Sequence, residues 1–105
     1  MTIKDYEIAR EVRNRISAVT EVLDFRVFGS RARGDAQVDS DMDIFVEVPR
    51  LDKSLKQKIR EKAWEVGLDN CIVISTIILS KDQVENSPLR ASPMVENIFH
   101  EGVMI

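Results

Sequence analysis

The chain has 105 residues, with 15 Lys and Arg against 18 Asp and Glu and a net charge of −3. This length fits one domain over residues 1–105, and the acidic balance disfavours a nucleic-acid partner, whose phosphates require a basic surface. No apolar run could span a bilayer, and acidic residues stand where a signal peptide would be apolar, so we expect a cytoplasmic protein with no membrane partner. The single cysteine, Cys71, excludes an intrachain disulfide and is expected inside a buried strand.

The first half of the chain predicts one helix and two strands. β-branched and aromatic residues predict short strands over residues 25–28 and 42–48. Before them, apolar residues at three- and four-residue spacing predict an amphipathic helix over residues 4–23. Its expected inward face consists of Ile8, Val12, Ile16, Val19 and Leu23.

The second half predicts a helix over residues 53–66, with Asp52 as its N-cap, Gly67 as its C-terminal stop and Trp64 packed against the protein. The apolar run over residues 71–79 is typical of a strand that is central or buried on both sides. Two shorter helices follow, one opened by a capping box at residues 80–83 and one over residues 93–101. This order predicts an α/β or α+β domain, with a mixed sheet and helices packed on it.

Two short polar motifs indicate the chemistry. Gly29 and Ser30 end the first predicted strand, and Asp41 and Asp43 open the second. If the two strands are antiparallel neighbours, the motifs lie side by side. Side chains alternate along a strand, so the two aspartates share a face, with Cα atoms about 6.5 Å apart. Such a pair suits two Mg²⁺ ions bridged by substrate phosphates.

The residues around Gly29 add features of a phosphate site. Gly29 permits close approach of the backbone to a phosphate, and Ser30 offers a backbone N–H and a hydroxyl. Residues 31–33 can form a helical turn whose N-terminus points at the anion, and Arg31 and Arg33 are candidates to neutralise a triphosphate. Each motif alone is a common turn or loop, so the indication rests on their combination.

The combined pattern is carried by Gly29-Ser30, Arg33-Gly34, Ser40-Asp41, Asp43 and Val46. It resembles the signature of the DNA polymerase β-type nucleotidyltransferase superfamily. Spacing and chain length are similar to those of its minimal nucleotidyltransferases, which are the small partners of HEPN-domain proteins in prokaryotic toxin–antitoxin pairs.

The resemblance implies specific roles for these residues. Gly29 and Ser30 would hold the triphosphate of ATP or another nucleoside triphosphate, while Asp41 and Asp43 would bind two Mg²⁺ ions and act in catalysis. An acceptor hydroxyl would attack the α-phosphate, with pyrophosphate leaving. In toxin–antitoxin members of the family, the acceptor is a tyrosine of the helical partner.

One part of the family pattern is missing. The superfamily supplies a third carboxylate, the general base, from the next core strand, and the corresponding run of this chain contains no acid. Asp69 and Glu47 are the nearest acids in sequence, but both are remote along an extended chain, and Ser75 or Thr76 could only orient a water. Loss of the base would slow the chemical step by about two to four powers of ten.

Two functions therefore stay open. The first is an enzyme that transfers AMP to a hydroxyl of a helical HEPN-type partner protein. The second is a non-catalytic, nucleotide-binding antitoxin that masks such a partner by surface complementarity. Transfer to a small molecule is disfavoured because the chain has no second domain to hold the acceptor, although a homodimer could build that cleft.

Overall fold

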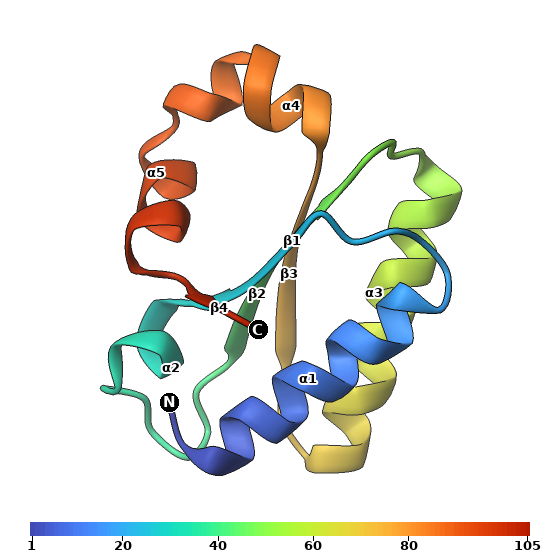
Figure 1. Cartoon of the computed structure of the whole chain (residues 1–105). Helices are drawn as coiled ribbons and strands as arrows, with labels where there is room; N and C mark the ends of the chain where they lie inside the picture. Colours follow the sequence, from blue (N-terminus) through green and yellow to red (C-terminus); the bar gives the residue numbers. More distant parts are fainter.

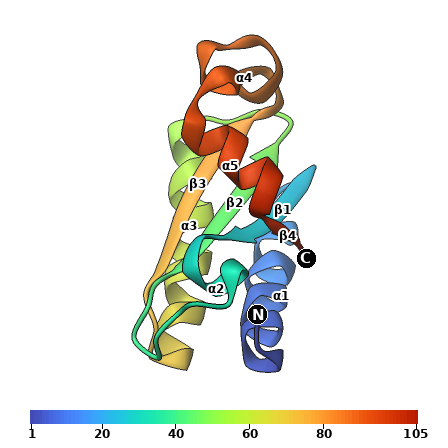
Figure 2. The same ribbon diagram turned by 90° about the vertical axis from the view of Figure 1, so that its left-hand side faces the viewer.

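The computed structural model describes residues 1–105 and consists of a mixed sheet with helices on both faces (Figures 1 and 2). The elements, in chain order, are α1 (Ile3–Ser17), β1 (Asp24–Phe28), α2 (Gly29–Arg33), β2 (Met42–Val48), α3 (Lys53–Asn70), β3 (Ile74–Ser80), α4 (Lys81–Asn86), the 3-10 helix η1 (Pro88–Ala91), α5 (Pro93–Glu101) and β4 (Val103–Met104). This architecture confirms the predicted fold class.

The sheet has the strand order β3-β2-β1-β4. β1 runs antiparallel to both β2 and β4, whereas β2 and β3 are parallel and are joined by α3. β3 is therefore an edge strand, so a central position for the predicted strand over residues 71–79 is wrong, and burial on both faces holds only at its end. Its end is buried at Ile78 and Leu79, but Val73, just before the strand, is 62% exposed. An apolar run cannot by itself distinguish an edge strand from a central one.

The main core lies between the sheet and the pair α1 and α3, which pack on the same face (Figure 1). Ile8, Val12 and Ile16 of α1 are buried as predicted, because their spacing places them on one side of the helix. The helix ends at Ser17, and Val19 and Leu23 beyond it are partly exposed, so the predicted helix was too long.

The opposite face carries a smaller core of Phe45, Leu79, Val95 and Ile98, covered by α4 and α5 (Figure 2). Phe99 of α5 packs edge-on against the Phe45 ring at 5.3 Å between centroids. After α5 the chain returns to the sheet as β4, so that the C-terminal residues lie along β1.

The C-terminal half of α3 differs from its prediction in four ways. The helix continues past Gly67 to Asn70, and Cys71 caps it in the left-handed conformation, at φ 56°. Gly67 is needed for a different reason: a Cβ there would come within 2.7 Å of the Ile72 carbonyl oxygen of the returning chain. Cys71 is exposed rather than buried in a strand, and Trp64 is 64% exposed rather than packed.

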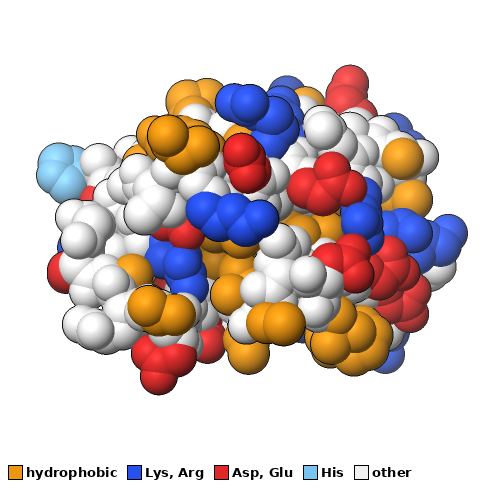
Figure 3. All heavy atoms as spheres, turned by 90° about the horizontal axis from the view of Figure 1, so that it is seen from below, with side chains coloured by type: hydrophobic (Ala, Val, Ile, Leu, Met, Phe, Trp, Pro, Cys, Tyr) orange, Lys and Arg blue, Asp and Glu red, His pale blue; other side chains and the backbone are white.

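The surface shows no field of one sign on the side drawn in Figure 3, where Lys and Arg side chains alternate with Asp and Glu. None of the helices combines the length and the apolar character that crossing a bilayer requires.

Candidate nucleotide-binding site

The junction between β1 and α2 forms a tight turn at Gly29. Its φ of 74° lies in the left-handed region, which favours glycine. A Cβ at this position would also collide with the Asp43 carboxylate. The following residue, Ser30, has a hydroxyl that makes no hydrogen bond within the chain and is therefore available to a ligand.

The register of the sheet brings the acidic motif to this turn. β1 and β2 are antiparallel neighbours, and Phe28 pairs with Asp43. Gly29 follows Phe28 directly, so the predicted convergence of the glycine turn with Asp43 is confirmed. Asp41 lies just before β2 and is exposed, whereas Asp43 is half-buried within the strand.

The electrostatics of Asp43 fit a cation site. Burial raises the pKa of this carboxyl above its ordinary value of 3.8, the negative charge of Asp41 raises it further, and Arg33 opposes both effects. A desolvated carboxylate beside a second negative charge is stabilised when a cation binds.

A hollow of about 560 Å³ opens in front of these residues. Phe28, Gly29, Ser30, Arg33 and Asp43 form one wall. The other wall is a stripe of α5 consisting of Met94, Asn97 and Glu101. The stripe was missed from the sequence, although its three- and four-residue spacing places these side chains on one side of α5, away from the buried Val95 and Ile98.

The structure places Arg31 outside the hollow. Its side chain is buried and forms a 2.8 Å ion pair with Asp5 of α1. The same guanidinium donates to the carbonyl oxygens of Val38 and Ser40, at 3.4 and 2.6 Å. Arg31 therefore holds the connection that leads to Asp41, and we assign it to that connection instead of to the triphosphate.

Arg33 is the cation of the hollow. Its exposed side chain forms ion pairs with Asp35, at 3.3 Å, and with Glu101, at 3.2 Å. The hydrogen bond that Arg33 donates to Asp35 and the charges of both acids raise the pKa of Arg33, which stays a cation. A phosphate group entering the hollow would compete with these two exposed carboxylates for the guanidinium.

No acid of β3 faces Asp43. The residue beside it in the parallel register is Ser75. Asp69 lies at the end of α3 and forms a 3.2 Å ion pair with Arg15 of α1, away from the hollow. Glu47 lies opposite Asp24 in the register of the sheet, at the end of β1 that is remote from Gly29. The further acid of the hollow is Glu101, which comes from α5 instead of from a strand.

The donors present fit Mg²⁺. No group of three or more His, Cys, Asp or Glu side chains is close enough in the chain to hold a metal ion by itself. Asp41 and Asp43 offer only oxygen ligands beside a phosphate-sized hollow, and Mg²⁺ typically takes one or two carboxylates together with substrate phosphates and water.

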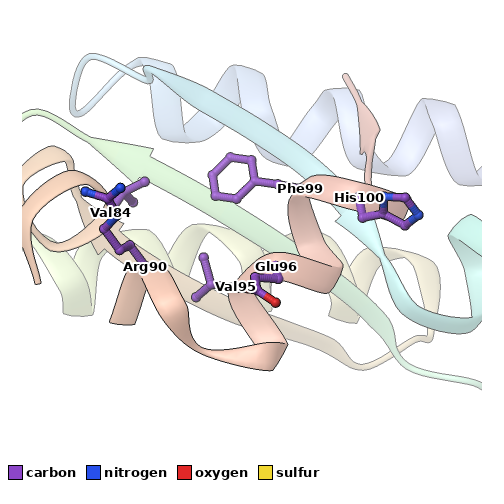
Figure 4. Close-up of a pocket in the computed structure, with 6 residues that line it drawn as sticks. All are labelled: Val84, Arg90, Val95, Glu96, Phe99 and His100. Carbon is purple, nitrogen blue, oxygen red and sulfur yellow. The ribbon is translucent and has the colours of Figure 1, made fainter. Parts of the chain in front are cut away.

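A second hollow, of about 460 Å³, lies between α4, η1 and α5 (Figure 4). It contains the apolar side chains of Val84, Val95 and Phe99, with Arg90 and Glu96 beside them. His100 lies in the last turn of α5 and is exposed. This hollow has neither a glycine turn nor a pair of acids, so it does not share the features of a phosphate site.

Residues 6–103 match the nucleotidyltransferase domain family. The chain belongs to this family. It is also 39% identical to a "Putative protein adenylyltransferase" of Methanocaldococcus jannaschii, in an alignment that covers 76% of this chain and 91% of the relative. The recognised DNA polymerase β-type pattern is thereby confirmed at the level of the family.

Two solved structures share the fold. A "putative nucleotidyltransferase" from Sulfolobus solfataricus superposes with a TM-score of 0.60 over 97% of this chain and 79% of that one, at 18% identity. A structure described as a toxin–antitoxin with AMP-PNP superposes with a TM-score of 0.63 over 97% of this chain and 72% of that one, also at 18% identity. At this identity the two structures confirm the fold of this nucleotidyltransferase domain and leave its substrates open.

Proposed function

We propose that this nucleotidyltransferase moves AMP from ATP to a hydroxyl group of a partner protein. The observation that carries the proposal is the convergence of Gly29, Ser30 and Asp43 at one end of an open hollow. The relative from Methanocaldococcus jannaschii, described as a protein adenylyltransferase, supports AMP as the group and a protein as the acceptor. The toxin–antitoxin structure with AMP-PNP is consistent with an adenine nucleotide and a protein partner. A helical HEPN-type protein as that partner, and its tyrosine as the acceptor, follow from the family resemblance of the sequence motif.

The residues of the hollow divide the work of this reaction. The backbone at Gly29 and the hydroxyl of Ser30 bind the triphosphate, and Arg33 turns from Glu101 to the phosphate oxygens. Asp43, and Asp41 just outside the lining of the hollow, would hold Mg²⁺, which would supply charge neutralisation for the phosphates and the leaving group.

The chemical step is an in-line displacement at the α-phosphorus. The acceptor oxygen forms a bond to phosphorus as the bond to the bridging oxygen of pyrophosphate breaks, and pyrophosphate leaves with that electron pair. The proton of the acceptor hydroxyl passes to Glu101, the carboxylate of the hollow that is left without its cation once Arg33 engages the phosphates.

The test is transfer of label from ATP labelled at the α-phosphate, with Mg²⁺, to proteins of a host lysate. We expect label on a discrete protein with the wild type and none with the Asp41→Asn/Asp43→Asn double variant. Asp39→Asn is the matched control, because Asp39 is an exposed acid of the same connection whose charge, unlike that of Asp41, is not among the causes of the raised pKa of Asp43. Equal labelling by the wild type and the double variant would contradict the proposal.

Replacing Glu101 tests its role as proton acceptor. We expect Glu101→Gln to slow AMP transfer about a hundredfold, because the amide cannot take a proton. ATP binding should be retained or tightened, since the variant removes a competitor for Arg33. Transfer and ATP affinity measured side by side separate the two effects, and an unchanged transfer rate would rule out this role.

A second candidate function is a nucleotide-binding antitoxin without catalysis. It is favoured by Ser75, which stands on β3 beside Asp43 where the superfamily supplies an acid. This function predicts that ATP binds, and that a HEPN-type partner is masked equally well by the wild type and the double variant. Label transfer that depends on Asp41 and Asp43 would exclude it.

A further inference from the structure

The outer side of β3 has unpaired backbone groups. The N–H of Met42 donates to the carbonyl of Val73 at 2.9 Å, and Met42 is level with Ile74 in the parallel register. Backbone groups alternate in direction along a strand, so Val73, Ser75 and every second residue after them bond to β2. Ile74, Thr76 and Ile78 point their N–H and C=O groups away from the sheet.

This edge lacks the usual protection against pairing. Residues 74–80 contain no charged residue and no proline, and no helix or loop pairs with the outer backbone groups of Ile74, Thr76 and Ile78. Proteins commonly protect an exposed edge with lysine, proline or a bulge. The one outward N–H that has a partner is that of Ser80, which donates to the Gln83 side chain at 3.0 Å, in the cap of α4. The outward backbone groups of Ile74, Thr76 and Ile78 are therefore unpaired, and those of Ile74 and Thr76 belong to partly exposed residues whereas Ile78 is 4% exposed.

The flank of this edge carries exposed apolar side chains among polar ones. We define the β3 edge surface as strand β3 together with Arg60, Glu61, Trp64 and Leu68 of α3. Trp64 and Leu68 are 64% and 58% exposed. Three adjoining hollows, of about 580, 340 and 190 Å³, lie along the surface and share Trp64 or Leu68. A large tryptophan in this setting is typical of a protein interface.

We propose that a second copy of this chain docks on the β3 edge surface and extends the sheet. The unpaired backbone N–H and C=O groups of a strand edge can hydrogen-bond to another strand, which a helical partner does not supply. The same strand of the second copy can fill this place. A two-fold axis at Thr76 puts the outward groups of Ile74 opposite those of Ile78 of the partner subunit, and those of Ile78 opposite those of Ile74 of the partner subunit. The interface is therefore complementary to itself, as a two-fold interface must be.

The charges of α3 support the same arrangement. Arg60 and Glu61 both line the hollow that reaches Thr76. Neither forms an ion pair within the chain, and Glu61 only accepts a hydrogen bond from Gln57, at 3.2 Å. A two-fold axis at Thr76 makes α3 antiparallel to the same helix of the second copy, so Arg60 meets Glu61 of the partner subunit, and this contact occurs twice.

The experiment is sedimentation of the full chain over a range of concentrations with a charge-swap series. We expect a dimer whose Kd rises about tenfold in Arg60→Glu and in Glu61→Arg, because each variant creates two like-charge contacts. The double variant R60E/E61R should return close to wild type, and Lys58→Glu, an equal charge change on the same helix outside the surface, should have no effect. A dimer that is insensitive to the series, or a monomer at every concentration, would overturn the proposal.

Amide hydrogen exchange of the wild type is a second measurement, which does not depend on whether a variant folds. In the wild type, the N–H groups of Ile74, Thr76 and Ile78 should become protected as concentration rises, whereas those of Ser75 and Ile77 stay protected throughout. Protection of the outer set only after a different protein is added would assign the surface to that protein and refute docking of a second copy.

Discussion

The two faces of the sheet are built from alternate residues of the same strands, yet they differ in what they bury. On the face under α1 and α3, β2 contributes Met42, Ile44 and Val46, all fully buried. On the other face it contributes Asp43 and Glu47, both half-buried acids. Burial is the leading cause of a raised pKa in both. Along β2 the first face is thus apolar throughout, while on the other face the fully buried Phe45 lies between two carboxylates that burial disfavours. A cation bound at Asp43 would relieve that cost at one of them.

The two acids on that face differ in the groups that lie beside them. Glu47 has Asp24 opposite it, and the charges of Asp24 and Glu85 add to the effect of burial on its pKa. Asp43 has the Gly29 turn beside it instead. A raised pKa is therefore common to both ends of β2, and only the end with the glycine turn has the geometry of a phosphate site.

The largest expected effect comes from comparing these acids directly. We expect Asp43→Asn to reduce AMP transfer about a thousandfold, because a ligand for the cation is lost, and Glu47→Gln to leave transfer near wild type. Both variants should unfold at an unchanged or higher temperature, since each removes a carboxylate that burial disfavours. Equal losses of activity in the two variants would break the distinction between the two ends of β2.

The next effect concerns two arginines of α2 that differ in burial. Arg31→Met should lower the free energy of unfolding by about 3 kcal/mol, because it leaves Asp5 buried without its partner. Arg33→Met should leave it near the wild-type value, because the ion pairs of Arg33 are exposed, while weakening ATP binding. Urea denaturation measures the first quantity and nucleotide titration the second. A stable Arg31→Met variant would refute the role of Arg31 in holding the connection.

A smaller effect separates the two glycines with positive φ. Gly34→Ala should cost about 1 kcal/mol from backbone strain alone, since nothing lies within 4 Å of a Cβ there. Gly29→Ala should cost more and should also impair AMP transfer, because its methyl group displaces the Asp43 carboxylate. Thermal unfolding and transfer rates of the pair give the comparison, and equal transfer by both variants would show that close approach at Gly29 is not needed.

Much of the fold follows from local patterns in the sequence. The strand over residues 42–48, the Asp52 cap and the capping box at Ser80 all match their predictions, because alternation and capping act within a few residues. The end of α3 does not match its prediction, since Gly67 is needed where the chain that follows the helix passes close to it. No local pattern distinguishes such a glycine from one that ends a helix. The exposure of Trp64 and the edge position of β3 depend on strand order, which is a tertiary property.

The candidate site was also predictable only where it depends on local patterns of the sequence. The meeting of Gly29 with Asp43 was predictable, because adjacent antiparallel strands fix which ends lie together. The burial of Arg31 was not, since its partner Asp5 is 26 residues away on another element. The contribution of Glu101 was also missed, because α5 reaches the hollow only through its packing on the opposite face of the sheet from α1.

The smallest effect is the pH dependence that the pKa of Asp43 confers on stability. The folded-state pKa is raised above the ordinary value of 3.8, so the folded chain takes up this proton at a higher pH than the unfolded chain does. Acidification through the folded-state pKa should therefore stabilise the wild type relative to Asp43→Asn, and the difference should level off below the ordinary value. Urea unfolding of both proteins from pH 7 down to that value measures the difference.

The neighbours of Asp43 decide how large this difference becomes. Asp41→Asn removes a negative charge and should reduce it without abolishing it, because burial is the larger cause of the raised pKa. Arg33→Met removes the opposing positive charge and should increase it. If Asp41→Asn abolished the difference entirely, the charge of Asp41, and not burial in the sheet, would be the source of the raised pKa. The raised pKa of Asp43 would then result from its contact with Asp41 alone, and not from its position on this face of the sheet.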